Sequence, residues 1–203
     1  MFRLKQTITT NCLKHCLIAT VFLLCACTPG NNKGGSGNYA IRSSSGEDLA
    51  VITISAEEIS MKDNEGQLIG VAKRSDKRKY YNPSNSMIYA VKLDDDGFKL
   101  RNGNEQLIWK VKLYDDKLKV ANNEEMTNAY EVKLYKDGKL KLQQNDKDIK
   151  AIRVSESKDL YDVDGQYQIQ GFGHSLAPGI LMIGDIGERE KFIIVAELAK
   201  RGR

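Results

Sequence analysis

Cysteine, histidine and long apolar runs are scarce in most of this sequence. The cysteines are Cys12, Cys16, Cys25 and Cys27, and the histidines are His15 and His174. Because no cysteine follows Cys27, the body of the chain is expected to have no disulfide bond and no cysteine-based metal site. The apolar run from Cys16 to Ala26 is far shorter than the ~20 residues of a membrane-spanning helix, so no permanent transmembrane helix is expected there.

A strong charge of either sign is also missing from the body of the chain. Three of the 31 Lys and Arg residues, Arg3, Lys5 and Lys14, lie in the first 26 residues, which contain no Asp or Glu. The rest of the chain contains 28 basic and 27 acidic residues, so its net charge is about +1. This balance gives no argument for a nucleic-acid partner, because binding to a phosphate backbone depends on an excess of Lys and Arg.

The first 26 residues have the three parts of a secretory signal peptide. Basic residues come first, the apolar run follows, and Ala26 supplies the small residue that precedes a cleavage site. The sequence Leu24-Cys25-Ala26-Cys27 resembles the lipobox of bacterial lipoproteins. This resemblance implies that the chain is cleaved before Cys27 and that Cys27 is lipidated.

The same resemblance implies that the protein is held at a membrane of the cell envelope. Cys27 would carry more than one acyl chain, palmitate among them, and two chains suffice for stable anchoring. Thr28 stands where an aspartate often retains lipoproteins at the inner membrane, which favours the outer membrane in a cell that has one. The expected organisation is a signal peptide at 1–26, a flexible tether at 27–38, a repeat domain at 39–170 and a C-terminal helical segment at 171–203. A tether of this length and composition has a reach of roughly 20 Å.

The body of the chain repeats itself about every twenty residues. The spacings between successive apolar anchor positions are 19, 20, 20, 21 and 20 residues. These anchors are Ile52, Val71, Val91, Val111, Val132 and Ile152. Such regularity indicates an array of similar structural units.

Each unit reads as a β-hairpin with one apolar face. Apolar and polar residues alternate from Trp109 to Tyr114, which is the period of a strand. A two-residue turn at Asp115-Asp116 then places Leu113 opposite Leu118. By the same count the third unit pairs Leu93 with Phe98 and Val91 with Leu100, and the first pairs Ile54 with Ile59 and Ile52 with Met61.

The later units vary this pattern. The fifth contains one extra residue, which predicts a three-residue turn at 136–138 with Gly138 in the left-handed region. In the sixth, Val154 is expected opposite Leu160. A further hairpin is expected to turn at Asp164-Gly165.

The predicted fold is therefore all-β, an antiparallel meander of about twelve short strands. One apolar face of such a sheet must be covered. Alternation along each strand favours a curled meander over a solenoid, and the sequence leaves open a barrel, a half-barrel or a sandwich.

The C-terminal segment is expected to form a helix packed on the sheet. Asp185 and Glu188 are spaced like an N-cap and its capping-box partner, and Gly202 suits the end of the helix. Phe192, Val195 and Ala199 form an apolar stripe. We interpret this tail as a plug or lid on the apolar face, with a helix lying on a membrane surface as the alternative.

Two segments resemble catalytic or metal-binding motifs only in part. Residues 173–177 resemble the nucleophile elbow of α/β-hydrolases, but that motif needs a parallel sheet and a later histidine, and no histidine follows Ser175. Residues 94–97 resemble a fragment of a calcium loop but lack its terminal glutamate, and a hairpin turn is needed there. We therefore expect no catalytic residue, no metal site and no cofactor.

The second hairpin is basic where its neighbours are apolar. Across the expected turn at 75–76, Lys73 should face Arg78, and Arg74 should face Lys77 on the other side. Like charges placed directly across a ladder destabilise it. The hairpin is therefore expected to be an exposed edge with charged side chains, or an anion-binding or partner-docking patch.

These features predict a noncatalytic lipid-anchored envelope lipoprotein with a structural or interaction role. Its expected contacts are the membrane, through the anchor, and an envelope protein or anionic lipid. The alternative is a carrier of an apolar or amphiphilic ligand inside the curled sheet, by analogy of architecture. An open apolar cavity of several hundred Å3 would favour the carrier, and a filled concave face would favour the interaction role.

Overall fold

The computed structural model describes residues 36–74, 76–155 and 159–203, with the backbone alone at positions 73 and 74. The predicted signal peptide, Cys27 and most of the predicted tether lie outside these residues. The elements are β1 Gly37–Arg42, β2 Asp48–Ile54, β3 Glu58–Asp63, β4 Gly66–Arg74, β5 Lys77–Tyr81, β6 Met87–Asp94, β7 Gly97–Asn102, β8 Leu107–Leu113, β9 Lys117–Ala121, β10 Tyr130–Leu134, β11 Lys139–Gln144, β12 Lys147–Ser155, β13 Leu160–Val163, β14 Tyr167–Gln170, the 3-10 helix η1 Ala177–Met182 and the α-helix α1 Glu188–Lys200.

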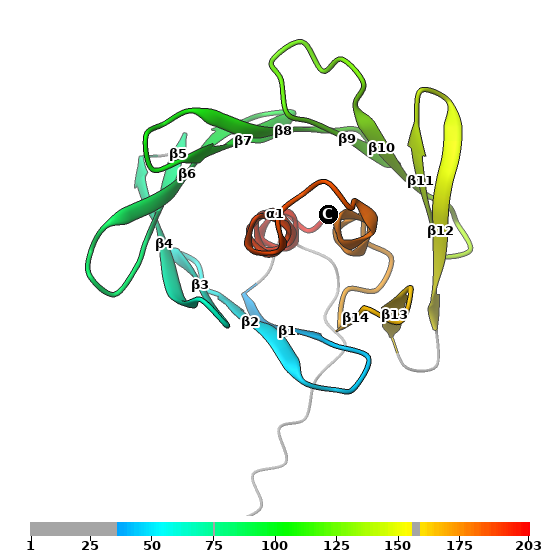
Figure 1. Ribbon diagram of the computed structural model, residues 1–203, viewed down its shortest axis with the longest axis horizontal. Helices are drawn as coiled ribbons and strands as arrows, with labels where there is room; N and C mark the ends of the chain where they lie inside the picture. The colour runs from blue at the N-terminus through cyan, green and yellow to red at the C-terminus, as the bar shows by residue number, and fades with distance from the viewer. Residues whose placement is uncertain (1–35, 75, 156–158) are drawn as a thin grey trace, which may run out of the picture. The chain divides into compact units, whose positions relative to one another are not determined.

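The strands form a closed antiparallel barrel (Figure 1). Each strand pairs with its neighbours in the sequence, and β1 pairs with β14, with Ile41 opposite Ile169. Closure pairs every strand on both sides, so that no edge is left among the described strands. Of the curled arrangements that the sequence allows, the chain thus adopts the barrel.

The predicted hairpin register is confirmed in the regular units. Leu113 lies opposite Leu118, Leu93 opposite Phe98 and Ile54 opposite Ile59. Gly138 has a φ of 73° in the turn between β10 and β11, as the extra residue of that unit predicts. The alternate apolar residues of the strands face inward and join one continuous core.

The sixth hairpin departs from its predicted register by one residue. Val154 lies opposite Tyr161, and Leu160 pairs with Ser155 instead. This register buries the Tyr161 side chain completely, and its hydroxyl donates to the carbonyl oxygen of Gly173 at 2.9 Å. Burial of a large ring with its hydroxyl satisfied favours this pairing over one that buries Leu160. The next turn is as predicted, between β13 and β14.

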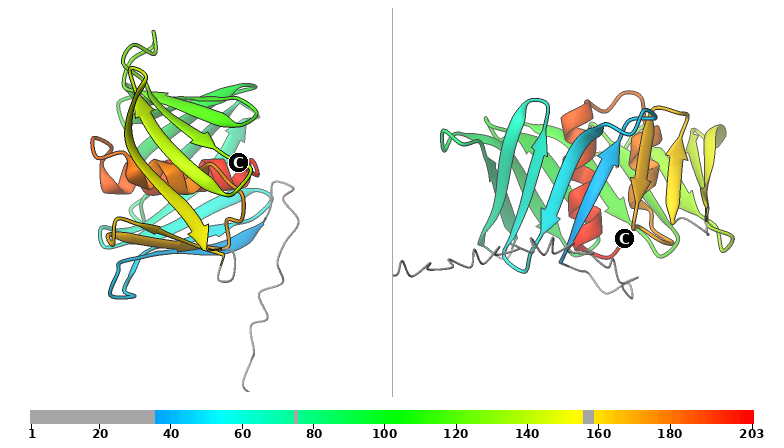
Figure 2. Two further views of the ribbon diagram at one scale, coloured as in Figure 1. Left: turned by 90° about the vertical axis from the view of Figure 1, so that its right-hand side faces the viewer. Right: turned by 90° about the horizontal axis from the view of Figure 1, so that it is seen from below.

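The C-terminal segment lies inside the barrel. Figure 1 shows α1 and η1 within the ring of strands, and both views of Figure 2 show α1 running along the barrel. Every residue from Lys191 to Ala199 is buried, and so are all six residues of η1. The predicted plug is confirmed. The helix is enclosed on all sides, however, whereas the sequence predicted contact with the sheet through one apolar stripe. This enclosure contradicts the alternative of a membrane-surface helix.

The predicted start of the helix is wrong, whereas its predicted end is confirmed. The N-cap is Gly187, and no side chain caps the first turn. Asp185 instead accepts a hydrogen bond from the Tyr130 hydroxyl at 2.5 Å, so its carboxylate holds the segment against β10. Gly202, with a φ of 69°, follows the C-cap residue Arg201.

Polar contacts fix α1 to the barrel at both of its ends. Near its start, Arg189 donates two hydrogen bonds of 2.8 Å to the Asp63 carboxylate at the end of β3. At its end, Lys200 donates to the carbonyl oxygens of Ser55 and Ala56 in the turn between β2 and β3. These contacts hold the helix along the whole length of the barrel.

Candidate functional site

Strand β5 places a cation inside the barrel. Its burial alternates, so that Arg78 and Tyr80 face inward, while Lys77 and Lys79 face outward. Arg78 is 5% exposed, and the Tyr80 side chain is fully buried. A charge at such a position is costly unless another charge or hydrogen bond compensates it.

Glu197 of α1 supplies that compensation. Arg78 Nη1 donates to Glu197 Oε2 at 2.5 Å, and the Tyr80 hydroxyl donates to Glu197 Oε1 at 2.8 Å. Glu197 is 0% exposed, so both of its oxygens are satisfied away from solvent. We name Arg78, Tyr80 and Glu197 the buried triad. Among the described residues, Arg78 Nε is the one buried side-chain nitrogen or oxygen without a hydrogen-bond partner.

The electrostatics of the buried triad keep Arg78 charged and Tyr80 neutral. Burial would lower the pKa of Arg78, but the charge of Glu197 and the hydrogen bond to it raise that pKa. Burial is the largest cause that raises the pKa of Tyr80 well above its ordinary value, and the negative charge of Glu197 raises it further. The arrangement is therefore a fixed ion pair with a phenol as its second donor.

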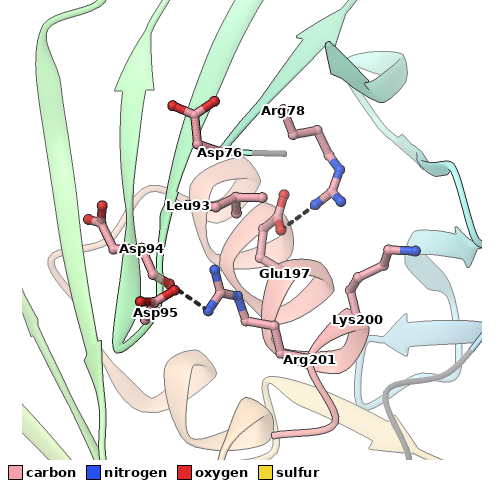
Figure 3. A pocket seen from close by; sticks show the side chains of 8 residues that line it. All are labelled: Asp76, Arg78, Leu93, Asp94, Asp95, Glu197, Lys200 and Arg201. Atoms are coloured by element: carbon pink, nitrogen blue, oxygen red, sulfur yellow. Dashed lines mark hydrogen bonds and ion pairs between the residues drawn. The ribbon is translucent and has the colours of Figure 1, made fainter. Parts of the chain in front are cut away.

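A pocket of about 540 Å3 opens beside the buried triad at one mouth of the barrel (Figure 3). Its lining residues are Asp76, Arg78, Leu93, Asp94, Asp95, Glu197, Lys200 and Arg201. Seven of these eight side chains are charged. Arg201 donates to the carbonyl oxygen of Asp94 at 3.2 Å, and burial lowers the pKa of both Lys200 and Arg201. The three cations of this pocket thus engage Glu197 or backbone carbonyl oxygens.

Two further pockets lie at the ends of β8 to β12 that are farther from the first pocket, where these strands meet the loop at 122–129. Their volumes are about 200 and 340 Å3, and both are lined by Asn128 and Gln144. The larger also contains Trp109 and Tyr130, but the Trp109 indole is 7% exposed and donates to Glu190 at 2.7 Å. Polar side chains predominate in both pockets, so neither resembles a site for an apolar ligand.

The structure corrects the interpretation of the basic second hairpin. The pairing of Arg74 with Lys77 is as predicted, but Ala72, not Lys73, lies opposite Arg78, because a register shift falls between Ala72 and Arg74. The hairpin is not a sheet edge, since β4 and β5 are paired on both sides. Arg78 points into the barrel, so it cannot form one surface patch with Lys77. The side chains of Lys73 and Arg74 lie outside what the structure describes.

Lys77 instead belongs to a larger basic surface on the outside of the barrel. We name the outward-facing Lys and Arg side chains of β5 to β11 the basic outer face. They are Lys77, Lys79, Lys92, Lys99, Arg101, Lys110, Lys112, Lys117, Lys119, Lys133, Lys139 and Lys141. Their outward direction follows from alternation with the buried apolar residues of the same strands.

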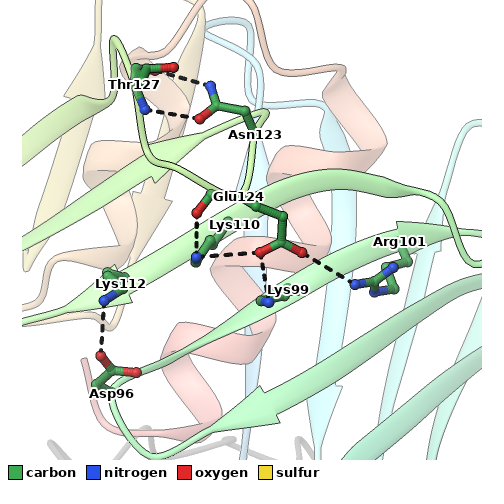
Figure 4. Close-up of polar contacts among 8 residues, drawn as sticks. All are labelled: Asp96, Lys99, Arg101, Lys110, Lys112, Asn123, Glu124 and Thr127. Atoms are coloured by element: carbon green, nitrogen blue, oxygen red, sulfur yellow. Dashed lines mark hydrogen bonds and ion pairs between the residues drawn. The ribbon is translucent and has the colours of Figure 1, made fainter.

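Loop carboxylates bind parts of this face. Glu124, in the loop between β9 and β10, makes ion pairs with Lys99 at 2.7 Å, Lys110 at 3.4 Å and Arg101 at 3.5 Å (Figure 4). The hydrogen bond from Lys99 is the largest cause that lowers the pKa of Glu124. Glu105 has the same relation to Lys77, whose hydrogen bond lowers the pKa of Glu105.

The remaining candidates from the sequence have structural roles or lie elsewhere. Ser175 is 8% exposed, and its hydroxyl accepts a hydrogen bond from the Ala177 backbone, in a chain whose sheet is antiparallel. Asp95 and Asp96 form the turn between β6 and β7. The residues that the structure covers contain no group of three or more His, Cys, Asp or Glu side chains arranged to hold a metal ion. Cys27 lies outside the described ranges.

Comparison with protein-family models, with curated proteins and with solved structures finds no match. Within the described part of the chain, no helix is both long enough and apolar enough to cross a membrane.

Sequence reasoning missed the buried triad, although the sequence contains a signal for it. Arg78 occupies a position where the other hairpins place an apolar residue. Glu197 interrupts the apolar run from Phe192 to Ala199. Two opposite charges, each at an otherwise apolar position, are candidates for pairing with one another, because buried charges are seldom left unpaired.

Proposed function

We propose that this protein is a noncatalytic envelope lipoprotein, anchored through Cys27, which presents the outer surface of a filled barrel to another envelope component. The observation that supports this role is the occupied interior. The core joins inward residues of the strands to residues of η1 and α1, such as Val132, Ile180 and Ile194, all 0% exposed. A partner therefore meets the outside of the barrel or its two mouths.

The occupied interior favours this role over the carrier alternative. A carrier needs an open apolar cavity of several hundred Å3. Here the corresponding space holds α1, which is fixed at one end by Arg189 and at the other by Lys200. Release of the helix would take Glu197 away from Arg78 and leave an unpaired charge facing the space that an apolar ligand would occupy, which makes ligand entry by helix displacement costly.

The path of the chain indicates which rim of the barrel the tether would join. Strand β1 begins at Gly37, and the antiparallel order puts this end of β1 on the same rim as the turns at 95–96 and 115–116. A tether running from Cys27 to Gly37 would therefore hold the barrel by this rim.

Metabolic labelling with palmitate tests the anchoring. Wild-type protein is expected to carry the label and to sediment with membranes, and Cys27→Ser should lose both properties. Cys25→Ser is the matched control, because Cys25 precedes the proposed cleavage site, and it should keep label and membrane retention. An unlabelled wild-type protein that remains in the soluble fraction would contradict the proposal.

A further inference from the structure

We propose that the basic outer face binds a linear polyphosphate chain, that is, a polymer of phosphate groups joined directly to one another by anhydride bonds. This inference deepens the proposed function by naming the chemistry of the partner. It rests on the arrangement of cations along the barrel, on their incomplete compensation and on the convex shape of the surface.

The cations form rows across neighbouring strands. Lys77 lies directly opposite Lys92, Lys92 opposite Lys99, and Lys99 opposite Lys110, which makes one row over β5 to β8. A second row continues over β9 to β11, where Lys133 lies opposite both Lys117 and Lys141. Like charges directly opposite one another destabilise a sheet, so the folded barrel alone gives no reason for such rows.

The barrel does not require lysine at these outer positions. On β1 to β4 of the same sheet, many corresponding outward positions carry neutral residues. Examples are Ala40, Thr53, Ser60 and Gln67. These strands pair into the same barrel with the same alternation. The cations are thus a property of one part of the outer surface and not of the fold.

The carboxylates around these cations neutralise only part of the charge. In the described part of the chain, six carboxylates make ion pairs with ten of the twelve cations of the basic outer face. They are Glu105, Glu124, Glu131, Asp96, Asp116 and Asp148. Several are shared, as Glu124 is by three cations. The lowered pKa of Glu105, Glu124 and Asp148 agrees with an excess of positive charge on this face.

The convex shape of the basic outer face favours binding of a flexible polymer over contact with a flat membrane. Neighbouring strands lie ~4.8 Å apart, so the row from Lys77 to Lys110 follows the circumference of the barrel with one cation at each strand. A flat bilayer can touch a convex barrel only along a narrow strip, whereas a flexible polymer can follow the curve. Repeated negative charges at short intervals would then meet successive lysines.

The side-chain chemistry favours phosphate. Eleven of the twelve cations are lysines, and Arg101 is the exception. Lysine acts as a compact point charge suited to phosphate, whereas recognition of planar carboxylates more often uses the fork of an arginine. Lysines of this kind impose little geometry on each group, which fits a repeating chain better than a single ligand.

Competition binding on immobilised long-chain inorganic polyphosphate tests the proposal. The full-length protein, purified in a nonionic detergent, is expected to bind and to be displaced by salt, because association with a polyanion releases its counterions. The binding needs no lipid anchor. Its failure would leave the result of the Cys27 labelling experiment unchanged, and the reverse also holds.

A triple variant, Lys92→Gln, Lys99→Gln and Lys110→Gln, removes three of the four cations of the first row. Its dissociation constant should rise at least about tenfold, and the slope of its logarithm against log salt should fall by about 2. The matched control changes three cations outside the face, Arg42, Lys62 and Lys147, to Gln. It loses the same net charge and should bind like the wild type. Equal losses in both variants, or unchanged binding in the first, would overturn the proposal, provided that thermal unfolding confirms that both fold.

Two competitors, compared at equal phosphate concentration, distinguish binding of a long polyphosphate from binding of short phosphate anions or of lipid headgroups. Long-chain polyphosphate should displace the protein far better than tripolyphosphate or mixed micelles containing phosphatidylglycerol. If tripolyphosphate competes equally, the face binds single anions only. If the micelles compete equally, the face docks on lipid. Either result, like the absence of any binding, would overturn the proposal.

Discussion

Arg78 Nη1 lies 2.5 Å from Glu197 Oε2 and so joins β5 to the C-terminal part of the enclosed helix α1 across 119 residues of sequence. Both side chains are nearly inaccessible to solvent, at 6% and 1%. Such a pair adds little net stability compared with apolar residues of the same volume, but loss of one partner leaves a buried charge without compensation. The pair therefore fixes which face of α1 meets β5.

Glu197→Ala should lower the free energy of unfolding by about 3–5 kcal/mol, because Arg78 would keep its buried charge without a partner. Asp48→Ala, which removes the exposed partner of Arg42, is the control and should cost less than about 1 kcal/mol. Urea unfolding measures both. Similar small losses in the two variants would contradict the buried position of Glu197.

Leu118→Ala should cost about 2–5 kcal/mol, because Leu118 is completely buried opposite Leu113. Tyr114→Ala should cost less, since the Tyr114 side chain is 42% exposed at the turn. Urea unfolding of the two variants compares them directly. A larger loss at Tyr114 would mean that the hairpin register is shifted by one residue, which exchanges its inward and outward faces.

Gly179→Ala should destabilise the protein by about 1–3 kcal/mol, because η1 packs closely against β10. A Cβ at Gly179 would lie 2.3 Å from Val132 Cγ1. Gly184→Ala is the control, since nothing lies within 4 Å of a Cβ added there. Differential scanning calorimetry should show a lower melting temperature for Gly179→Ala alone. Equal melting temperatures would argue against η1 inside the barrel.

The stability of the barrel should fall as the pH rises from about 10 to 12. Burial, and then the charge of Asp159, raises the pKa of Tyr161 to about 12, whereas an unfolded tyrosine titrates near about 10. The folded state therefore keeps a proton that the unfolded state loses, and this contribution to stability is present below the unfolded pKa and is lost through the folded one. Tyr161→Phe should flatten the fall of unfolding free energy in this window. An unchanged slope would contradict the buried neutral phenol.

The sequence predicts the hairpins well and the long-range contacts poorly, for a physical reason. The register of Leu113 and Leu118 depends on a period of two and on the length of one turn, both of which are local. The pairing of Ile41 with Ile169, by contrast, joins the two ends of the meander and depends on the curvature of all the strands between them. The register at Val154 depends on the number of residues that separate β12 from β13, which differs from the number between the strands of the regular units.

The candidate sites show the same difference between local features, which the sequence predicts, and long-range contacts, which it does not. The basic second hairpin was visible in the sequence, but the partner of Arg78 was not, because Glu197 belongs to a helix that was expected to cover the sheet with one stripe. The rows of the basic outer face needed only the hairpin register together with the order of the units. Their cations could therefore have been aligned from the sequence once neighbouring hairpins were assumed to pair.

Mass spectrometry of the protein extracted from membranes, recorded under native and then under denaturing conditions, tests the central claim most directly. The proposal of a lipid-anchored barrel with a filled interior predicts one species in both spectra. Its mass should be that of residues 27–203 with acyl groups attached at Cys27. A chain that begins elsewhere or carries no acyl group would contradict the anchor, and a lipid mass that disappears on denaturation would contradict the filled interior and favour a carrier.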